Sequence, residues 1–159
     1  MSDRSLRVAI AALATVGVGI AAYLTYVHYA GLHPLCLASG GCEQVQSSRY
    51  AKLAGVPVAV LGLGGYLAIL ASLLVRGEAG RAGGACLALA GFGFSAYLTY
   101  RELFTIKAVC QWCVASAILM TLLAVLTTIR LLAAEAETAE VVSPAARARR
   151  PVRPARGSS

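Results

Sequence analysis

The sequence predicts an all-α integral membrane protein, a four-transmembrane-helix bundle with an outward loop that bears a cysteine pair. Its 159 residues are 58% hydrophobic and only 13% charged, a balance less polar than that of a soluble domain. Four stretches contain no charged residue, and each approaches or exceeds the roughly 20 residues that cross a bilayer as a helix. These stretches are residues 8–27, 53–75, 82–100 and 108–129.

The uncharged stretches divide the chain into a leader, one membrane domain and a tail. We expect a cytoplasmic leader at 1–7, a membrane domain at 8–132 and a cytoplasmic, largely disordered tail at 133–159. The expected helices are about 8–29, 55–75, 82–100 and 108–132, with the outer loop at 30–54. The first stretch is longer than a usual signal core, so we expect it to stay in the protein.

The basic residues predict the orientation. With both termini in the cytoplasm, ten arginines fall in cytoplasmic segments, and the outer segments keep only Arg49, Lys52, Arg101 and Lys107. This is the positive-inside bias of a multi-pass protein of the cell (inner or plasma) membrane. Both cysteine-bearing regions then lie on the extracytoplasmic side, where disulfides form. The net charge of +7 therefore indicates contact with a lipid bilayer and no nucleic acid.

The first expected helix has a near copy in the third. Residues 11–26 match residues 85–100 at ten of sixteen positions, including Gly17 with Gly91. The same shift carries Cys36 onto Cys110. The match indicates an internal duplication, in which two helical hairpins of the same polarity each carry a cysteine after their first helix.

The outer loop contains the first cysteine pair. Cys36 and Cys42 are separated by Leu-Ala-Ser-Gly-Gly, whose glycines let the chain double back for a reversible bridge. The second helix begins near Val-Pro at 56–57, because proline suits a first helical turn. Its glycines at 62, 64 and 65 are expected to allow close helix packing.

The second cysteine pair, Cys110-Gln-Trp-Cys113, opens the fourth stretch. Cysteines at i and i+3 share one helical face, about 4.5 Å apart along the axis, so they can close a tight disulfide. The positive end of the helix dipole also favours a thiolate there. Taken alone, the motif could equally be a pair of buried cysteines or half of a metal site.

Two outward cysteine pairs predict a thiol relay, because thiol–disulfide exchange passes two electrons from pair to pair. The sequence has no Gly-x-Gly-x-x-Gly motif and no haem attachment motif to take the electrons onward. A membrane quinone, menaquinone or ubiquinone, is the natural acceptor. Trp112 is expected in the aromatic belt at the membrane surface, and contact with the quinone ring is its second interpretation.

The order of the loop cysteine pair, the serines at 47 and 48 and the Cys-x-x-Cys motif resembles the vitamin K epoxide reductase family, particularly its bacterial members. The segment 42–50 and the Val-Pro-Val start of the second helix are also similar to that family. The resemblance covers roughly residues 8–132. In the enterobacterial disulfide-bond oxidase, another four-helix bundle, Cys-x-x-Cys comes before the more widely spaced pair.

The resemblance implies a four-helix bundle around a quinone and a role for each site residue. Cys36 would exchange with a thioredoxin-like partner, Cys42 would bridge to Cys110, and Cys113 would face the quinone and reduce it. Ser48, with Ser47 the weaker candidate, would hydrogen-bond a quinone carbonyl. The alternative for either serine is an N-cap of the next helix.

Two departures from the family refine this expectation. This chain lacks the fused thioredoxin-like domain of many bacterial members, so its partner would be a separate extracytoplasmic thioredoxin-like disulfide oxidase. Ala117 stands where animal members have a tyrosine, which favours plain quinone reduction over epoxide reduction. Other functions remain open: a structural protein with static disulfides, or a metal-handling protein with zinc or copper on His28, His33, Cys36 and Cys42. Our expectation is a quinone-dependent thiol oxidoreductase without a metal.

Overall fold

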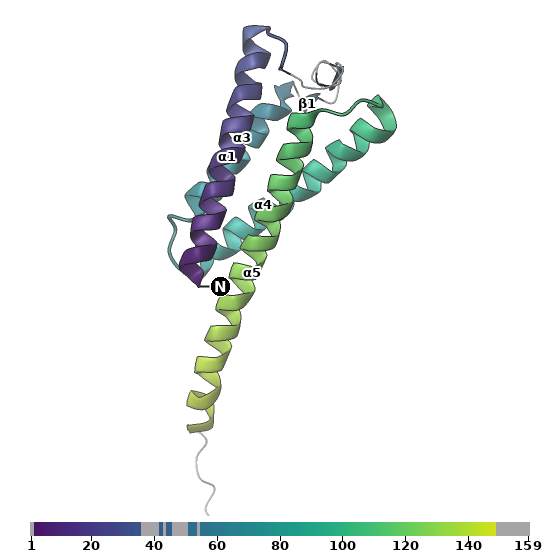
Figure 1. Ribbon diagram of the computed structural model, residues 1–159. Coiled ribbons are helices and arrows are strands. Elements are labelled where there is room, and N and C mark those ends of the chain that lie inside the picture. The colour runs from purple at the N-terminus through teal and green to yellow at the C-terminus, as the bar shows by residue number, and fades with distance from the viewer. Residues whose placement is uncertain (1, 36–41, 43, 46–50, 54, 149–159) are drawn as a thin grey trace, which may run out of the picture.

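The computed structural model describes residues 2–35, 42, 44–45, 51–53 and 55–148, with side chains described up to residue 140. Its helices are α1 (Asp3–Ala30), α3 (Val58–Ser72), α4 (Glu78–Arg101), the short π-helix η2 (Glu102–Ile106) and α5 (Gln111–Ala148). Strand β1 (Lys52–Leu53) pairs antiparallel with β2 (Val56–Pro57) in a tight hairpin before α3. The described chain is therefore mostly helical (Figure 1).

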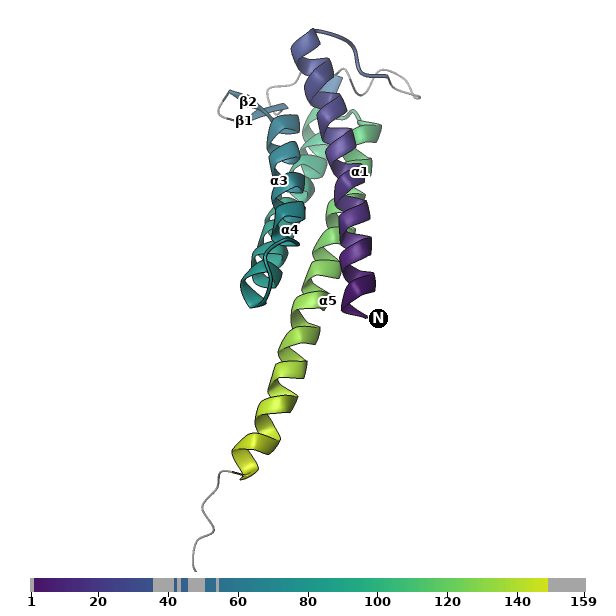
Figure 2. The same ribbon diagram turned by 90° about the vertical axis from the view of Figure 1, so that its left-hand side faces the viewer.

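The described α-helices pack in a ring: α1 contacts α3 and α5, and α4 contacts the same two. The C-terminal part of α5 projects beyond the bundle in both views (Figures 1 and 2). Within the described residues, three helical segments are long and apolar enough to cross a membrane, namely Asp3–Ala30, Glu78–Ile106 and Gln111–Glu140. The helix Val58–Ser72 is apolar but shorter.

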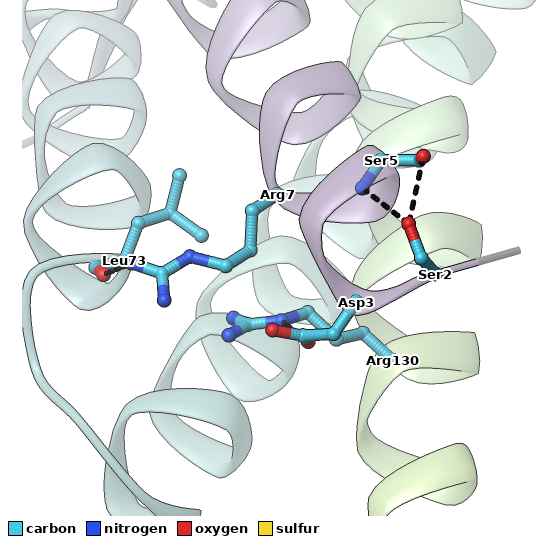
Figure 3. Close-up of polar contacts among 6 residues, drawn as sticks. All are labelled: Ser2, Asp3, Ser5, Arg7, Leu73 and Arg130. Atoms are coloured by element: carbon cyan, nitrogen blue, oxygen red, sulfur yellow. Dashed lines mark hydrogen bonds and ion pairs between the residues drawn. The ribbon is translucent and has the colours of Figure 1, made fainter.

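Both ends of α1 are set by local capping residues, which the hydrophobic pattern does not reveal. The Ser2 hydroxyl accepts a hydrogen bond from the Ser5 backbone N–H at 3.3 Å, so the helix begins at Asp3 instead of residue 8 (Figure 3). Gly31 ends it in the left-handed conformation, at φ 63°. At the other end of the chain, α5 continues past 132 because the segment there is rich in the strong helix formers Ala and Glu.

Two glycines that align in the sequence repeat both allow close packing. A Cβ on Gly17 would overlap the ring of Tyr66, which is fully buried in the core. A Cβ on Gly91 would lie 2.9 Å from the Met120 sulfur. Close packing was also expected at Gly62, Gly64 and Gly65, and that prediction is wrong. An added Cβ meets nothing within 4 Å at the first two and only the Met120 methyl, at 4.0 Å, at the third.

A polar clamp joins three helices at the end of the bundle where α1 begins (Figure 3). The buried Arg130 of α5 donates from Nε to Asp3 Oδ1 at 2.8 Å, and Arg7 donates to the Leu73 carbonyl oxygen at 2.7 Å. The hairpin and η2 lie at the opposite end (Figure 1). The clamp thus fixes the end of the bundle remote from the Cys-x-x-Cys motif.

Candidate functional site

The segment between η2 and α5 places the Cys-x-x-Cys motif at a helix N-terminus. Lys107 adopts a left-handed conformation, at φ 54°, and ends η2. The Cys110 carbonyl oxygen then accepts the Val114 N–H at 3.0 Å, which is the first turn of α5. Both cysteines therefore lie at the positive end of the α5 dipole, where a thiolate is stabilised.

The two sulfurs of the motif have different environments. Both are free thiols, Cys110 fully buried and Cys113 partly buried. A hydrogen bond from the Cys113 thiol lowers the pKa of Cys110 below the ordinary range of a cysteine, although burial opposes it. The backbone N–H groups of Cys113 and Trp112 lower this pKa further, whereas the charge of Glu102 raises it. These hydrogen-bond donors favour the thiolate form of Cys110.

Glu102 is a site residue that the sequence analysis missed. It is only 4% exposed, and its Oε2 accepts the Cys110 backbone N–H at 3.3 Å. The side chain of Cys113 lies beside the same carboxyl group. A single acidic residue in the expected link between two membrane helices forms no pattern that marks it as part of a site.

The described part of the outer loop brings Cys42 to the membrane pair. Cys42 is disulfide-bonded and 2% exposed. It packs in a buried cluster with Val45 and Cys110. The cluster is bordered by Ile106, Ala108, Trp112 and Cys113. The other loop candidates, Cys36, Ser47 and Ser48, lie outside the described residues.

Trp112 connects the motif to the start of the outer loop. Its indole N–H donates to the Leu35 carbonyl oxygen at 2.8 Å, and the Gln111 side chain donates to the same oxygen at 3.3 Å. The Leu35 N–H donates to the Tyr23 hydroxyl at 3.0 Å. The rings of Tyr23 and Trp112 lie 5.1 Å apart. Trp112 thus lies on the loop side of the motif.

A cavity of about 380 Å³ opens on the other side of the motif. It is lined by α1, α3, α4, η2 and α5, from Cys113 down to Met120, a depth of about 10 Å along the helix. The lining is mainly apolar and includes Gly62 and Gly65, whose missing side chains leave room. The polar lining residues are Ser95, Thr99, Arg101, Glu102, Cys113 and Ser116. A mostly apolar cavity with a few polar groups at one end is typical of a site for a small organic molecule.

Metal ligation has less support than thiol chemistry in the part of the chain that the structure describes. There, no group of three or more His, Cys, Asp or Glu side chains is placed to hold a metal ion. The zinc site considered from the sequence includes Cys36, which lies outside the described residues.

Apolar helices long enough to cross a membrane, with a paired-thiol motif packed against a disulfide-bonded cysteine, define a membrane thiol–disulfide oxidoreductase. The vitamin K epoxide reductase family model matches residues 8–128. The chain belongs to this family, and the resemblance found in the sequence is thereby confirmed. It is therefore a multi-pass membrane protein of an oxidoreductase family linked in general to quinone and vitamin K reduction.

Proposed function

We propose that this protein reoxidises an extracytoplasmic thioredoxin-like disulfide oxidase and passes the electrons to a membrane quinone, menaquinone or ubiquinone. The path runs from Cys36 and Cys42 to Cys110 and Cys113. One observation carries the proposal: Cys110 is buried against Cys42, while Cys113 lines the apolar cavity. The Cys-x-x-Cys motif thus contacts the outer loop on one side and the cavity on the other.

Cys110 is the sulfur at which the two pairs meet. A Cys42 thiolate that attacks Cys110 in the Cys110–Cys113 disulfide frees Cys113 beside the cavity. Closure of the Cys36–Cys42 disulfide then leaves Cys110 and Cys113 reduced. In the structure Cys42 is disulfide-bonded, and Cys110 and Cys113 are free thiols.

The cavity suits a quinone because its lining is apolar and its polar groups gather near Cys113. A bound quinone supplies an acceptor for two electrons and two protons. Cys113 and Ser116 contribute polar atoms at the ring end, and Ser48, or less directly Ser47, would close the outer side. Trp112 acts on the loop in this proposal, because its indole N–H is bonded to Leu35.

The proposed topology has four spans, with both termini cytoplasmic and the cysteine pairs outside. Helix α3 has 15 residues, about 22 Å of helix, which is shorter than the roughly 30 Å of hydrocarbon. Apolar residues extend it at both ends: Val56 precedes it, and Leu73, Leu74 and Val75 follow it. These flanking residues allow the segment to complete a crossing.

The test is quinone reduction by the purified protein with a reduced thioredoxin-like donor. Alanine in place of Cys36, Cys42, Cys110 or Cys113 should abolish partner-driven turnover. With a small dithiol that reaches Cys110 directly, the Cys36→Ala and Cys42→Ala variants should keep some turnover, and Cys113→Ala should have none. Cys86→Ala is the matched control, because Cys86 is an exposed free thiol of α4 outside the site.

Three outcomes would contradict the proposal. Retained quinone turnover in Cys113→Ala would remove this residue as the one that faces the acceptor. Disulfides that stay oxidised whatever donor or quinone is added would assign the protein to the structural class. Stoichiometric zinc or copper without thiol-dependent quinone turnover would indicate metal handling instead.

A further inference from the structure

The buried Glu102 carboxylate lies at the point where electrons would leave the protein. It lines the cavity together with Cys113 and accepts the Cys110 backbone N–H at 3.3 Å. A carboxylate buried this deeply requires hydrogen-bond donors to offset its lost hydration. The backbone N–H of Cys110 is one such donor, and the Cys113 side chain lies beside the carboxyl group.

Within the described residues, few other titratable side chains lie near this carboxylate. Cys110 and Cys113 lie beside it at the start of α5, and the cavity-lining residues of α1 and α3 carry no titratable group. Arg101 also lines the cavity, and its side chain donates to the Tyr97 hydroxyl at 3.2 Å. Lys107 ends η2. The two sulfurs are therefore the redox-active groups beside Glu102.

Disulfide formation changes this arrangement in one direction. When Cys110 and Cys113 join, the Cys113 S–H bond is lost and its proton must pass to an acceptor. The Glu102 carboxylate lines the cavity together with Cys113 and accepts the Cys110 N–H, so it is placed to be that acceptor. The proton that must leave and a group that can take it thus lie in the same cavity lining.

We propose that Glu102 is a catalytic residue that takes the proton of Cys113 when the pair closes its disulfide, and holds it at the cavity for the reduced acceptor. This inference rests on the proposed function. Cys110 and Cys113 lose two electrons and form the S–S bond, and the quinone gains two electrons and two protons. One proton comes through Glu102. The second proton comes from water. It balances the proton that the Cys110 thiol released to water when it became a thiolate.

The decisive measurement determines how many protons are released when the Cys110–Cys113 pair is oxidised in the absence of quinone. The full-length chain with Cys36, Cys42 and Cys86 replaced by alanine keeps only the Cys110–Cys113 pair. Its midpoint potential is measured across the neutral pH range in dithiothreitol buffers, with alkylation of free thiols as the readout. With Glu102 present, oxidation should release one proton fewer per two electrons than in the Glu102→Gln variant. The Glu102→Asp variant keeps a carboxyl group and should restore at least part of the difference.

A second readout needs no substitution at position 102. The infrared difference spectrum of the oxidised minus the reduced chain should contain the C=O band of a newly protonated carboxylic acid, and Glu102→Gln should lack this band. The inference would be overturned if the parent chain and the Glu102→Gln variant released equal numbers of protons on oxidation. It would also be overturned if the parent chain showed no carboxylic acid band.

Quinone turnover separates this inference from the proposed function. Glu102→Gln should lower quinone turnover roughly 100-fold or more, the usual contribution of a positioned proton acceptor, with recovery in Glu102→Asp. Normal quinone reduction without a difference in proton count would overturn the role of Glu102 and leave the electron path intact. A proton difference without any quinone turnover would support Glu102 and reject the quinone as acceptor.

Discussion

The Leu35 peptide group is held on both of its polar atoms. Its carbonyl oxygen accepts from the Trp112 indole, and its N–H donates to the Tyr23 hydroxyl. Its side chain is 77% exposed, so packing does little to fix this point of the chain. Because Leu35 directly precedes Cys36, these hydrogen bonds limit how far the start of the loop can move from the Cys-x-x-Cys motif.

Trp112→Phe should therefore slow transfer between the cysteine pairs. The phenyl ring still packs on Tyr23, but the 2.8 Å hydrogen bond from the indole is lost, and the Leu35 oxygen keeps the 3.3 Å contact from Gln111. One such hydrogen bond contributes about 1 kcal/mol. Partner-driven turnover should fall about fivefold, while turnover with a small dithiol that reaches Cys110 directly should be unchanged. Tyr23→Phe removes the hydroxyl that accepts the Leu35 N–H, and it should lower partner-driven turnover in the same way. An equal loss of turnover with the partner protein and with the small dithiol would show that Trp112 acts at the quinone instead.

Helix α3 presents different residues to the core and to the cavity. Tyr66 and Ile69 are fully buried against the neighbouring helices, and the Tyr66 hydroxyl lies 2.8 Å from the Ser116 hydroxyl. Gly62 and Gly65 line the cavity, whereas Gly64 is exposed outside it. The same short helix thus supports the bundle and leaves the space that a quinone would occupy.

Gly62→Leu is expected to impair quinone binding without unfolding the bundle. An added side chain at this position meets no neighbour at its Cβ, but it extends into the region of the cavity. Overfilling a packed site costs about 1–3 kcal/mol, so the KM for quinone should rise roughly 5- to 150-fold. Gly64→Leu is the matched control, with open space around its Cβ and no place in the lining. Equal effects of the two substitutions would argue against this cavity as the quinone site.

The sequence predicted those parts of the molecule that depend on local patterns. Long uncharged stretches form helices wherever they occur, and the cysteines of Cys-x-x-Cys share one helix end by spacing alone. Glu102 was missed because a single acidic residue has no pattern, and its contact with Cys113 requires η2 to turn back over α5. The glycines of α3 were misread for a related reason. A glycine that allows close packing and one that leaves a cavity look identical until the neighbouring helices are placed.

On the scale of the whole molecule, the basic residues are distributed unequally between the two ends of the bundle. Arg4 and Arg7 lie at the start of α1, and Arg76 and Arg81 flank the α3–α4 turn at the same end. The outer link between α4 and α5 is at the opposite end with Cys110. Because cytoplasmic segments carry the excess of Lys and Arg, this division predicts that the cysteine pairs face the extracytoplasmic side. The proposed electron path depends on this orientation, since the proposed thioredoxin-like partner would have to reach the loop.

The orientation can be read from two engineered cysteines in a full-length chain whose native cysteines are replaced by alanine. Leu32→Cys introduces a thiol beside the loop, and Ala79→Cys introduces one beside the α3–α4 turn; both positions are exposed. In intact cells, a membrane-impermeant maleimide should label the first variant. It should label the second only after the membrane is permeabilised, because the positive-inside bias places that turn in the cytoplasm. The reverse pattern would place Cys110 on the reducing side, where disulfides are not maintained, and a disulfide-forming partner could not receive its oxidising equivalents from this protein.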